Sequence, residues 1–138
     1  MLQAFTQIHW LAVLVATLAF SLLGGVWFAG LFGKEYLAAL GRAGDPPPKP
    51  TPLFIAGPPL CGFVTATTSA LLMRAVEVGS WGEAALFGVV VGVGYLVSTM
   101  TTIAINPNFP HPLRYVRLNA PYFLIASVVV SLVLFAMG

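Results

Sequence analysis

The sequence predicts an all-α integral membrane protein, a four-helix transmembrane bundle that forms a single domain over residues 1–138. Three observations predict this fold class. Hydrophobic residues make up 59% of the chain and charged residues only 7%, whereas soluble domains carry about 25% charged residues. A chain of 138 residues has too small an interior to bury so much apolar surface, so the excess is expected to face lipid. Finally, four apolar segments contain no Asp, Glu, Lys or Arg, and each is long enough to cross a bilayer, which takes about 20 helical residues.

The four expected spans are residues 8–31, 53–73, 84–105 and 118–138. Each is expected to be a helix, because an isolated segment in lipid has to satisfy its own backbone polar groups. The first span is expected to remain in the mature protein. No Lys or Arg precedes Lys34, and the apolar run is longer than the ~7–15 residues of a signal-peptide core.

Prolines punctuate the chain around the second span. Residues 41–52 are the longest polar stretch and hold five prolines, which favour a stiff, extended linker. Pro58 and Pro59 lie inside the second apolar run. Either the helix starts there, with Pro58 in its first turn, or it starts near Leu53 and kinks at the proline pair. The sequence leaves both alternatives open.

Two turns connect the remaining spans. Residues 74–83 are few and rich in Gly and Ser, so the second and third spans are expected to form an antiparallel hairpin. Residues 106–117 hold three prolines and predict a structured turn before the fourth span. Asn119 is expected to cap the fourth helix, with Pro121 in its first turn.

The distribution of cations predicts the orientation in the membrane. Arg74 is the only Lys or Arg on the side that carries both termini. By the positive-inside rule, the more basic side faces the cytoplasm, so both termini are expected outside a multi-pass protein of the inner or plasma membrane. The five residues of the basic side are Lys34, Arg42, Lys49, Arg114 and Arg117.

Several functional classes are disfavoured. The cations are too few and too scattered for nucleic-acid binding. Cys61 is the only cysteine, so no disulfide forms within the chain. No metal-ligand spacing or cofactor motif is present, and His9 and His111 are expected near opposite membrane faces, so we expect no metal and no cofactor. The spans hold no acid or base of the kind that proton-coupled transporters use.

Small residues at intervals of four predict the helix contacts. In lipid, helices associate by close packing, which small side chains permit. The pattern predicts tight contacts, either within one chain or with a second copy or another membrane protein. The residues expected in these contacts are Ser21, Gly25 and Ala29 in the first span, Gly57 and Cys61 in the second, and Ala84, Gly88 and Gly92 in the third.

Polar residues gather at two places within the spans. Two interpretations stay open: each hydroxyl bonds the carbonyl one turn back, or the group lines a polar path or ligand pocket. The candidate ligand or pore-lining residues are Thr65, Thr68 and Ser69 in the second span, and Tyr95, Ser98, Thr102 and Asn106, which share one face of the third.

The end of the first span carries a recognisable pattern. It consists of a glycine, a Trp-aromatic pair, and an aromatic-Gly-Lys where the helix leaves the bilayer. The matching residues are Gly24, Trp27, Phe28, Phe32, Gly33 and Lys34. This pattern resembles the signature of a bacterial membrane family known as domain of unknown function 1761.

Further residues extend the resemblance over most of the chain. They are Asn106, Phe109, Pro112 and Tyr122. Where the family pattern has an acid-Ala-Gly, this chain has Asn119-Ala120-Pro121. The resemblance implies four spans and names no activity. By physical chemistry the signature predicts an anchor at the end of the helix, with the aromatic rings at headgroup level and Lys34 reaching the cytoplasm. The alternative is that this corner contacts a ligand.

Three hypotheses about function follow, and the first two do not make the protein an enzyme. The first is the binding or translocation of a small neutral or lipid-like solute through a hydroxyl-lined interior, as an oligomer. The second is a structural or accessory subunit of a membrane complex. The third is a membrane enzyme that works at the cytoplasmic rim through His111, Arg114, Arg117 and the tyrosines of that rim.

Overall fold

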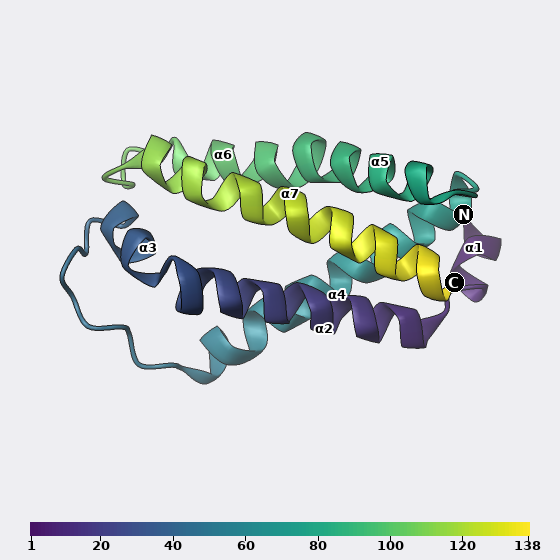
Figure 1. Cartoon of the computed structure of the whole chain (residues 1–138), viewed down its shortest axis with the longest axis horizontal. Helices are drawn as coiled ribbons and strands as arrows, with labels where there is room; N and C mark the ends of the chain where they lie inside the picture. The colour runs from purple at the N-terminus through teal and green to yellow at the C-terminus, as the bar shows by residue number, and fades with distance from the viewer.

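The computed structural model describes residues 1–138 and confirms the all-α class, since every element is helical. Four helical stretches are long and apolar enough to cross a membrane, and they lie side by side in one bundle (Figure 1). The four stretches are Trp10–Leu31, Pro52–Ala75, Trp81–Ala104 and Pro112–Met137. The expected four-helix transmembrane architecture is therefore confirmed.

Two of the four stretches contain a wider, π-helical turn. The first consists of α2 (Trp10–Gly25) and the π-helical segment η1 (Val26–Leu31). The third consists of α5 (Trp81–Val91), the π-helical segment η2 (Gly92–Val97) and α6 (Ser98–Ala104). The second and fourth are the single helices α4 (Pro52–Ala75) and α7 (Pro112–Met137). Two short helices, α1 (Leu2–Thr6) and α3 (Gly33–Ala39), flank the first stretch.

Helix α7 lies at the centre of the bundle. It packs against α5 on one side and α2 on the other, while α4 packs mainly against α2 (Figure 1). Both termini and the α4–α5 turn lie at one end, which we call the termini end (Figure 1). Residues 40–51 and 105–111 lie at the opposite end, which we call the loop end. The basic loops therefore share the loop end, and Arg74 lies at the termini end.

The interior of the bundle is built from small side chains. Only 24 of the 138 residues are buried, and many Leu, Val and Ile side chains point outwards. This distribution is the reverse of a soluble domain of this size and suits a surface that faces lipid. Alanines occupy the helix contacts, where they allow close approach. The buried contact residues include Ala12 and Ala16 of α2, Ala66 and Ala70 of α4, and Ala126 and Val130 of α7.

The second span begins before its proline pair. The Thr51 hydroxyl oxygen accepts a hydrogen bond from the backbone N–H of Phe54 at 3.2 Å, and Pro52 occupies the first helical position. Helix α4 then runs through Pro58 and Pro59 to Ala75. Of the two alternatives, the structure has the early start. Because proline lacks an N–H, the carbonyls four residues before the pair lose their helical donors.

The fourth span begins earlier than expected, and the prediction that Asn119 caps it is wrong. Helix α7 starts at Pro112, directly after the turn. Proline suits the first helical position, where its missing N–H costs nothing. Asn119 therefore lies inside the helix, only 3% exposed, and its Nδ2 donates to the Tyr115 carbonyl oxygen at 2.8 Å. Pro121 likewise lies inside α7 rather than in its first turn.

Candidate functional site

The seven candidate ligand-lining residues divide between two parts of the bundle. Tyr95, Ser98, Thr102 and Asn106 lie on η2, α6 and the turn that follows, and all four are exposed on the outer face of the bundle. The other three lie on α4: Thr68 is exposed, Thr65 is half-buried and Ser69 is buried. Since α6 packs on α7 and α4 packs mainly on α2, the two groups do not meet around one interior.

Some of these polar groups are satisfied within their own helix. The hydroxyls of Thr65 and Thr102 each donate to the carbonyl one turn back, Cys61 and Ser98 respectively, at 3.0 Å. Asn106 accepts hydrogen bonds from the backbone N–H and the side chain of Asn108, so it shapes the turn before α7. For Thr65 and Thr102, the structure contains the bond to the carbonyl one turn back that the first interpretation describes.

Tyr95 lines a groove between the third and fourth spans. The groove has a volume of about 380 Å³ and lies between η2–α6 and α7. Three hydroxyl-bearing side chains and four apolar ones form its wall; we call it the hydroxyl groove. Its lining residues are Tyr95, Leu96, Thr99, Met100, Ile103, Tyr115 and Phe123.

Sequence reasoning did not single out Thr99 and Tyr115 as lining residues. Thr99 follows Tyr95 by one helical turn, a spacing that could have identified it. Tyr115 comes from α7, and nothing in the local pattern links it to Tyr95. The structure thus assembles the groove from one predicted residue and two polar residues that sequence reasoning missed.

The family-pattern residues converge on Tyr122 of α7. The Trp27 indole N–H donates to the Leu118 carbonyl oxygen at 3.2 Å. The Phe28 ring centroid lies 4.9 Å from that of Tyr122. A Cβ atom on Gly24 would come within 2.9 Å of the Tyr122 hydroxyl, so the glycine leaves room for the phenol. These residues join the end of the first span to the start of the fourth.

The rest of the pattern completes this aromatic corner. The centroid of the Phe32 ring lies 4.8 Å from that of the Trp27 ring. A Cβ on Gly33 would lie 3.2 Å from the Phe28 carbonyl oxygen, a tight approach at the start of α3. Lys34 is exposed at the loop end. The pattern therefore builds a packed corner between helices.

The aromatic corner adjoins the hydroxyl groove through two tyrosines. The ring centroids of Tyr36 and Tyr115 lie 6.0 Å apart, and Tyr115 also lines the groove. Burial raises the pKa of Tyr36 to about 12, and the neighbouring Tyr115 adds to the rise. Both effects favour the neutral form of the Tyr36 phenol.

The predicted helix-packing residues serve different surfaces. A Cβ on Gly88 would lie 2.6 Å from the Val128 Cα, and one on Gly92 would lie 3.2 Å from the Ser127 Cβ, so both hold α5–η2 close to α7. Ala84 is fully buried.

The predicted packing residues of the first and second spans do not make such close contacts. The Ser21 side chain is half-buried and donates to the Thr17 carbonyl oxygen within its own helix. Gly25, Ala29 and Cys61 are exposed, and the Cβ positions of Gly25 and Gly57 meet no atom within 4 Å.

The residues proposed for a rim enzyme are spread along the loop end. His111, Arg114 and Arg117 are exposed on the turn before α7 and on its first turns. None of them forms an ion pair, since the one ion pair in the chain joins Arg42 and Asp45 at 3.0 Å. His9 precedes α2 at the termini end, far along the bundle from His111.

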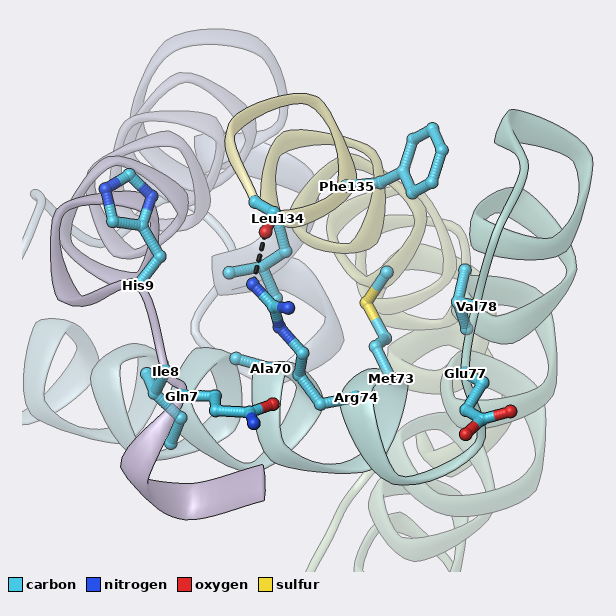
Figure 2. A pocket seen from close by; sticks show the side chains of 11 residues that line it. Gln7, Ile8, His9, Ala70, Met73, Arg74, Glu77, Val78, Leu134 and Phe135 are labelled. Carbon is cyan, nitrogen blue, oxygen red and sulfur yellow. Dashed lines mark hydrogen bonds between the residues drawn. The ribbon is translucent and has the colours of Figure 1, made fainter. Parts of the chain in front are cut away.

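A second cavity opens at the termini end, and sequence reasoning missed it. It has a volume of about 420 Å³ and lies between the α1–α2 connection, the end of α4 and the end of α7 (Figure 2). Gln7, His9, Arg74 and Glu77 are its polar residues, over an apolar floor. We call it the termini-end cavity. Its lining comes from three distant segments, which no local pattern connects.

Comparison with known proteins yields one match. The model of the family described as "Protein of unknown function (DUF1761)" matches residues 11–135, which include nearly all of the four spans and the aromatic corner. No curated protein and no solved structure matches the chain. The family resemblance seen in the sequence is therefore confirmed, and the family description names no activity.

Proposed function

The chain belongs to the DUF1761 family of unknown function, and we propose that it binds a neutral, lipid-like molecule in the hydroxyl groove. One observation carries the proposal: the groove places the hydroxyls of Tyr95 and Thr99, which have no hydrogen-bond partner in the chain, beside an apolar wall inside the membrane-spanning region. Its volume of about 380 Å³ falls within the range of small-molecule pockets, roughly 300–1,000 Å³.

The depth of Tyr95 explains why its hydroxyl needs a partner. The third stretch is 24 residues long, and at a rise of about 1.5 Å per residue Tyr95 lies about 4 Å from its middle. The hydrocarbon core extends about 15 Å on either side of the midplane. A polar group without a partner in that region costs about 1–3 kcal/mol. The side chains of Tyr95 and Thr99 make no hydrogen bond within the chain, so a hydroxyl or ester of a bound molecule would satisfy them.

The lining indicates the chemistry of the ligand. No charged side chain lines the groove, so nothing there compensates a charged headgroup. Leu96, Met100 and Phe123 offer an apolar wall, which suits an acyl chain or a ring system. Tyr95 is 70% exposed on the bundle surface, so a molecule can enter sideways from the bilayer.

The position of the groove favours binding over translocation. Its lining residues belong to the loop-end half of the third span and the first half of α7. A molecule held there contacts one leaflet. The five cations of the loop end support a cytoplasmic location for that leaflet. A reporter fused after Gly138 tests this orientation: activity on the outer face of the membrane is expected, and cytoplasmic activity would reverse it.

Photo-cross-linking tests the binding proposal. The probe is a diacylglycerol with a diazirine in one acyl chain, added to the protein in phosphatidylcholine vesicles. Labelling is expected to concentrate on residues 95–103 and 115–123. The double variant Tyr95→Phe/Thr99→Val removes two hydroxyls at nearly constant shape and should reduce that labelling roughly tenfold.

Thr68→Val supplies the matched control, because Thr68 is an exposed hydroxyl residue outside the groove. Its labelling should equal that of the wild type. Labelling spread evenly over all lipid-facing helices, or unchanged in the double variant, would refute the proposal.

A second candidate function is assembly with another chain. The observation that favours it is the glycine surface on α2 and α4, where Gly25 and Gly57 approach no other part of the chain. Glycines on a lipid-facing surface allow close approach of another helix. Gly25→Leu is expected to shift the size distribution in native mass spectrometry toward the monomer. Val93→Leu, at an exposed position of the third span, is the control. An unchanged distribution for Gly25→Leu would exclude this surface.

A further inference from the structure

The first two turns of α7 carry two arginines without a partner in the chain. Arg114 and Arg117 are both exposed, and the side chain of neither makes a hydrogen bond or an ion pair with another residue. The loop end has two carboxylates. Asp45 pairs with Arg42 at 3.0 Å, and Glu35 forms no ion pair. The guanidinium groups of the two α7 arginines therefore keep their N–H donors free for another acceptor.

The two arginines are neighbours on the surface of a regular helix. They are three residues apart, a spacing that brings the Cβ atoms of a helix to about 5–6 Å from each other. Both lie within α7, whereas Arg42 and Lys49 lie in the segment between α3 and α4, outside the helices. Two guanidinium groups held at this spacing can donate to one phosphate group, because the planar fork of each suits phosphate oxygens.

The position of the arginines does not serve the stability of α7. The N-terminus of a helix carries a partial positive charge, so a cation in the first turn is unfavourable for the helix. Arg114 lies in that turn, which contains no acidic residue. The helix dipole and the two guanidinium groups therefore add to one positive potential, which an anion from outside the chain would relieve.

An exposed apolar stripe continues along α7 from the arginines. Pro121 and Ile125 follow Arg117 at intervals of four residues, so they share its face, and both are exposed. Helix α7 is 26 residues long, whereas about 20 residues cross the hydrocarbon core. Its first turns therefore reach the headgroup region while Ile125 lies at the depth of the acyl chains. A molecule on this face would meet two cations at headgroup level and an apolar surface below them.

We propose that Arg114 and Arg117 form a binding site for the headgroup phosphate of an anionic phospholipid, with an acyl chain along Pro121 and Ile125. The site is distinct from the hydroxyl groove. Arg117 is two positions from Tyr115, which lines the groove, so it points to another face of α7. Its ligand is charged rather than neutral, and its failure would leave the groove proposal unaffected.

Native mass spectrometry of the intact protein in mild detergent tests this proposal. Phosphatidylglycerol and phosphatidylcholine with the same acyl chains are titrated separately. The wild type is expected to bind one phosphatidylglycerol at least roughly tenfold more tightly than phosphatidylcholine. Arg114→Gln/Arg117→Gln should abolish this preference. Arg114→Lys/Arg117→Lys, which keeps both charges but loses both forks, should retain only part of it.

Arg42→Gln/Lys49→Gln is the matched control, since it removes two positive charges from the same end of the bundle and should leave the preference unchanged. Equal binding of both lipids by the wild type would overturn the proposal. An equal loss of preference in the control and in Arg114→Gln/Arg117→Gln would show diffuse attraction by the whole loop end, which also contradicts a single site.

Two further outcomes bear on the assignment. Inorganic phosphate that displaces phosphatidylglycerol when present at the same concentration would show a free-anion site and overturn the lipid assignment; no displacement is expected, because phosphate has no acyl chain. If Arg114→Gln/Arg117→Gln does not fold, a reduced preference in the folded Arg114→Lys/Arg117→Lys variant supports the proposal, and a full preference there contradicts it.

Discussion

The contact between α5 and α7 offers a quantitative test of the packing, through the substitution Gly88→Ala. A Cβ atom at this position would lie 2.6 Å from the Val128 Cα and 3.0 Å from the Ser127 carbonyl oxygen. Both are backbone atoms of α7, so no side chain can rotate away. The added methyl group is about 0.8 Å short of the 3.4 Å at which ordinary contact begins, so the two helices have to separate.

The energetic cost follows from two opposing terms. Overpacking of a close contact costs about 1–3 kcal/mol, whereas replacing a helical glycine by alanine gains about 0.5–1 kcal/mol. A net loss of about 1–2 kcal/mol lowers the Tm of a domain of this size by roughly 3–10 °C. The measurement is thermal unfolding of the detergent-solubilised protein, followed by circular dichroism.

Gly94→Ala provides the matched control on the same stretch, because a Cβ there would meet no atom within 4 Å. Its Tm is expected to equal or slightly exceed that of the wild type. If Gly88→Ala is as stable as Gly94→Ala, the close approach of α5 to α7 is not present and the arrangement of the bundle is wrong.

Three further predictions concern the corner and the turns. Trp27→Phe replaces the indole by a smaller aromatic ring and loses the hydrogen bond to the Leu118 carbonyl, which should cost at least about 1 kcal/mol and lower the Tm. Ser80→Ala removes the side chain that accepts from the Glu83 N–H at the start of α5, and it should also cost about 1 kcal/mol in thermal unfolding. The pKa of Tyr36 is about 12 in the folded protein, against an ordinary value of 10.0. The neutral phenol is thus favoured by folding, so Tyr36 should leave stability unchanged below pH 10 and reduce it as the pH rises toward 12. Denaturation at alkaline pH should show that loss in the wild type and less of it in Tyr36→Phe; an equal loss in both would contradict the prediction.

The fold class was predictable because it depends on composition alone. Four uncharged apolar segments require a membrane environment, and their number and order fix an antiparallel arrangement. The exact start of α7 was harder to predict from the sequence, although proline, here Pro112, is common at the first position of a helix. Asn119 was a competing start signal, and its buried position shows that its amide serves the helix interior.

The packing surfaces show why a four-residue spacing is insufficient on its own. In the second span the predicted stripe ran through Gly57 and Cys61, yet Gly57 has open space beyond it and Cys61 is exposed. Gly62, one position further on, makes the close contact: a Cβ there would lie 2.7 Å from the Phe20 ring. Spacing identifies a face, but only the rotation of the helix about its axis decides whether that face meets the same chain.

The hydroxyl groove and the termini-end cavity depend on the same rotation and on distant segments. Tyr95 was recognisable as a polar residue in a span, but its pairing with Tyr115 requires the packing of η2 and α6 on α7. The termini-end cavity combines Gln7, Arg74 and Leu134, which are separated by most of the chain. Sequence patterns within single helices carry no information about such combinations.

Native mass spectrometry of the wild-type protein, released gently from its own membrane, tests the binding proposal for the hydroxyl groove most directly. We expect the wild type to retain one neutral lipid per chain, and we expect Tyr95→Phe/Thr99→Val to lose it while Thr68→Val keeps it. A wild-type protein free of neutral lipid, or a double variant that retains the same lipid in the same amount, would contradict the proposed function.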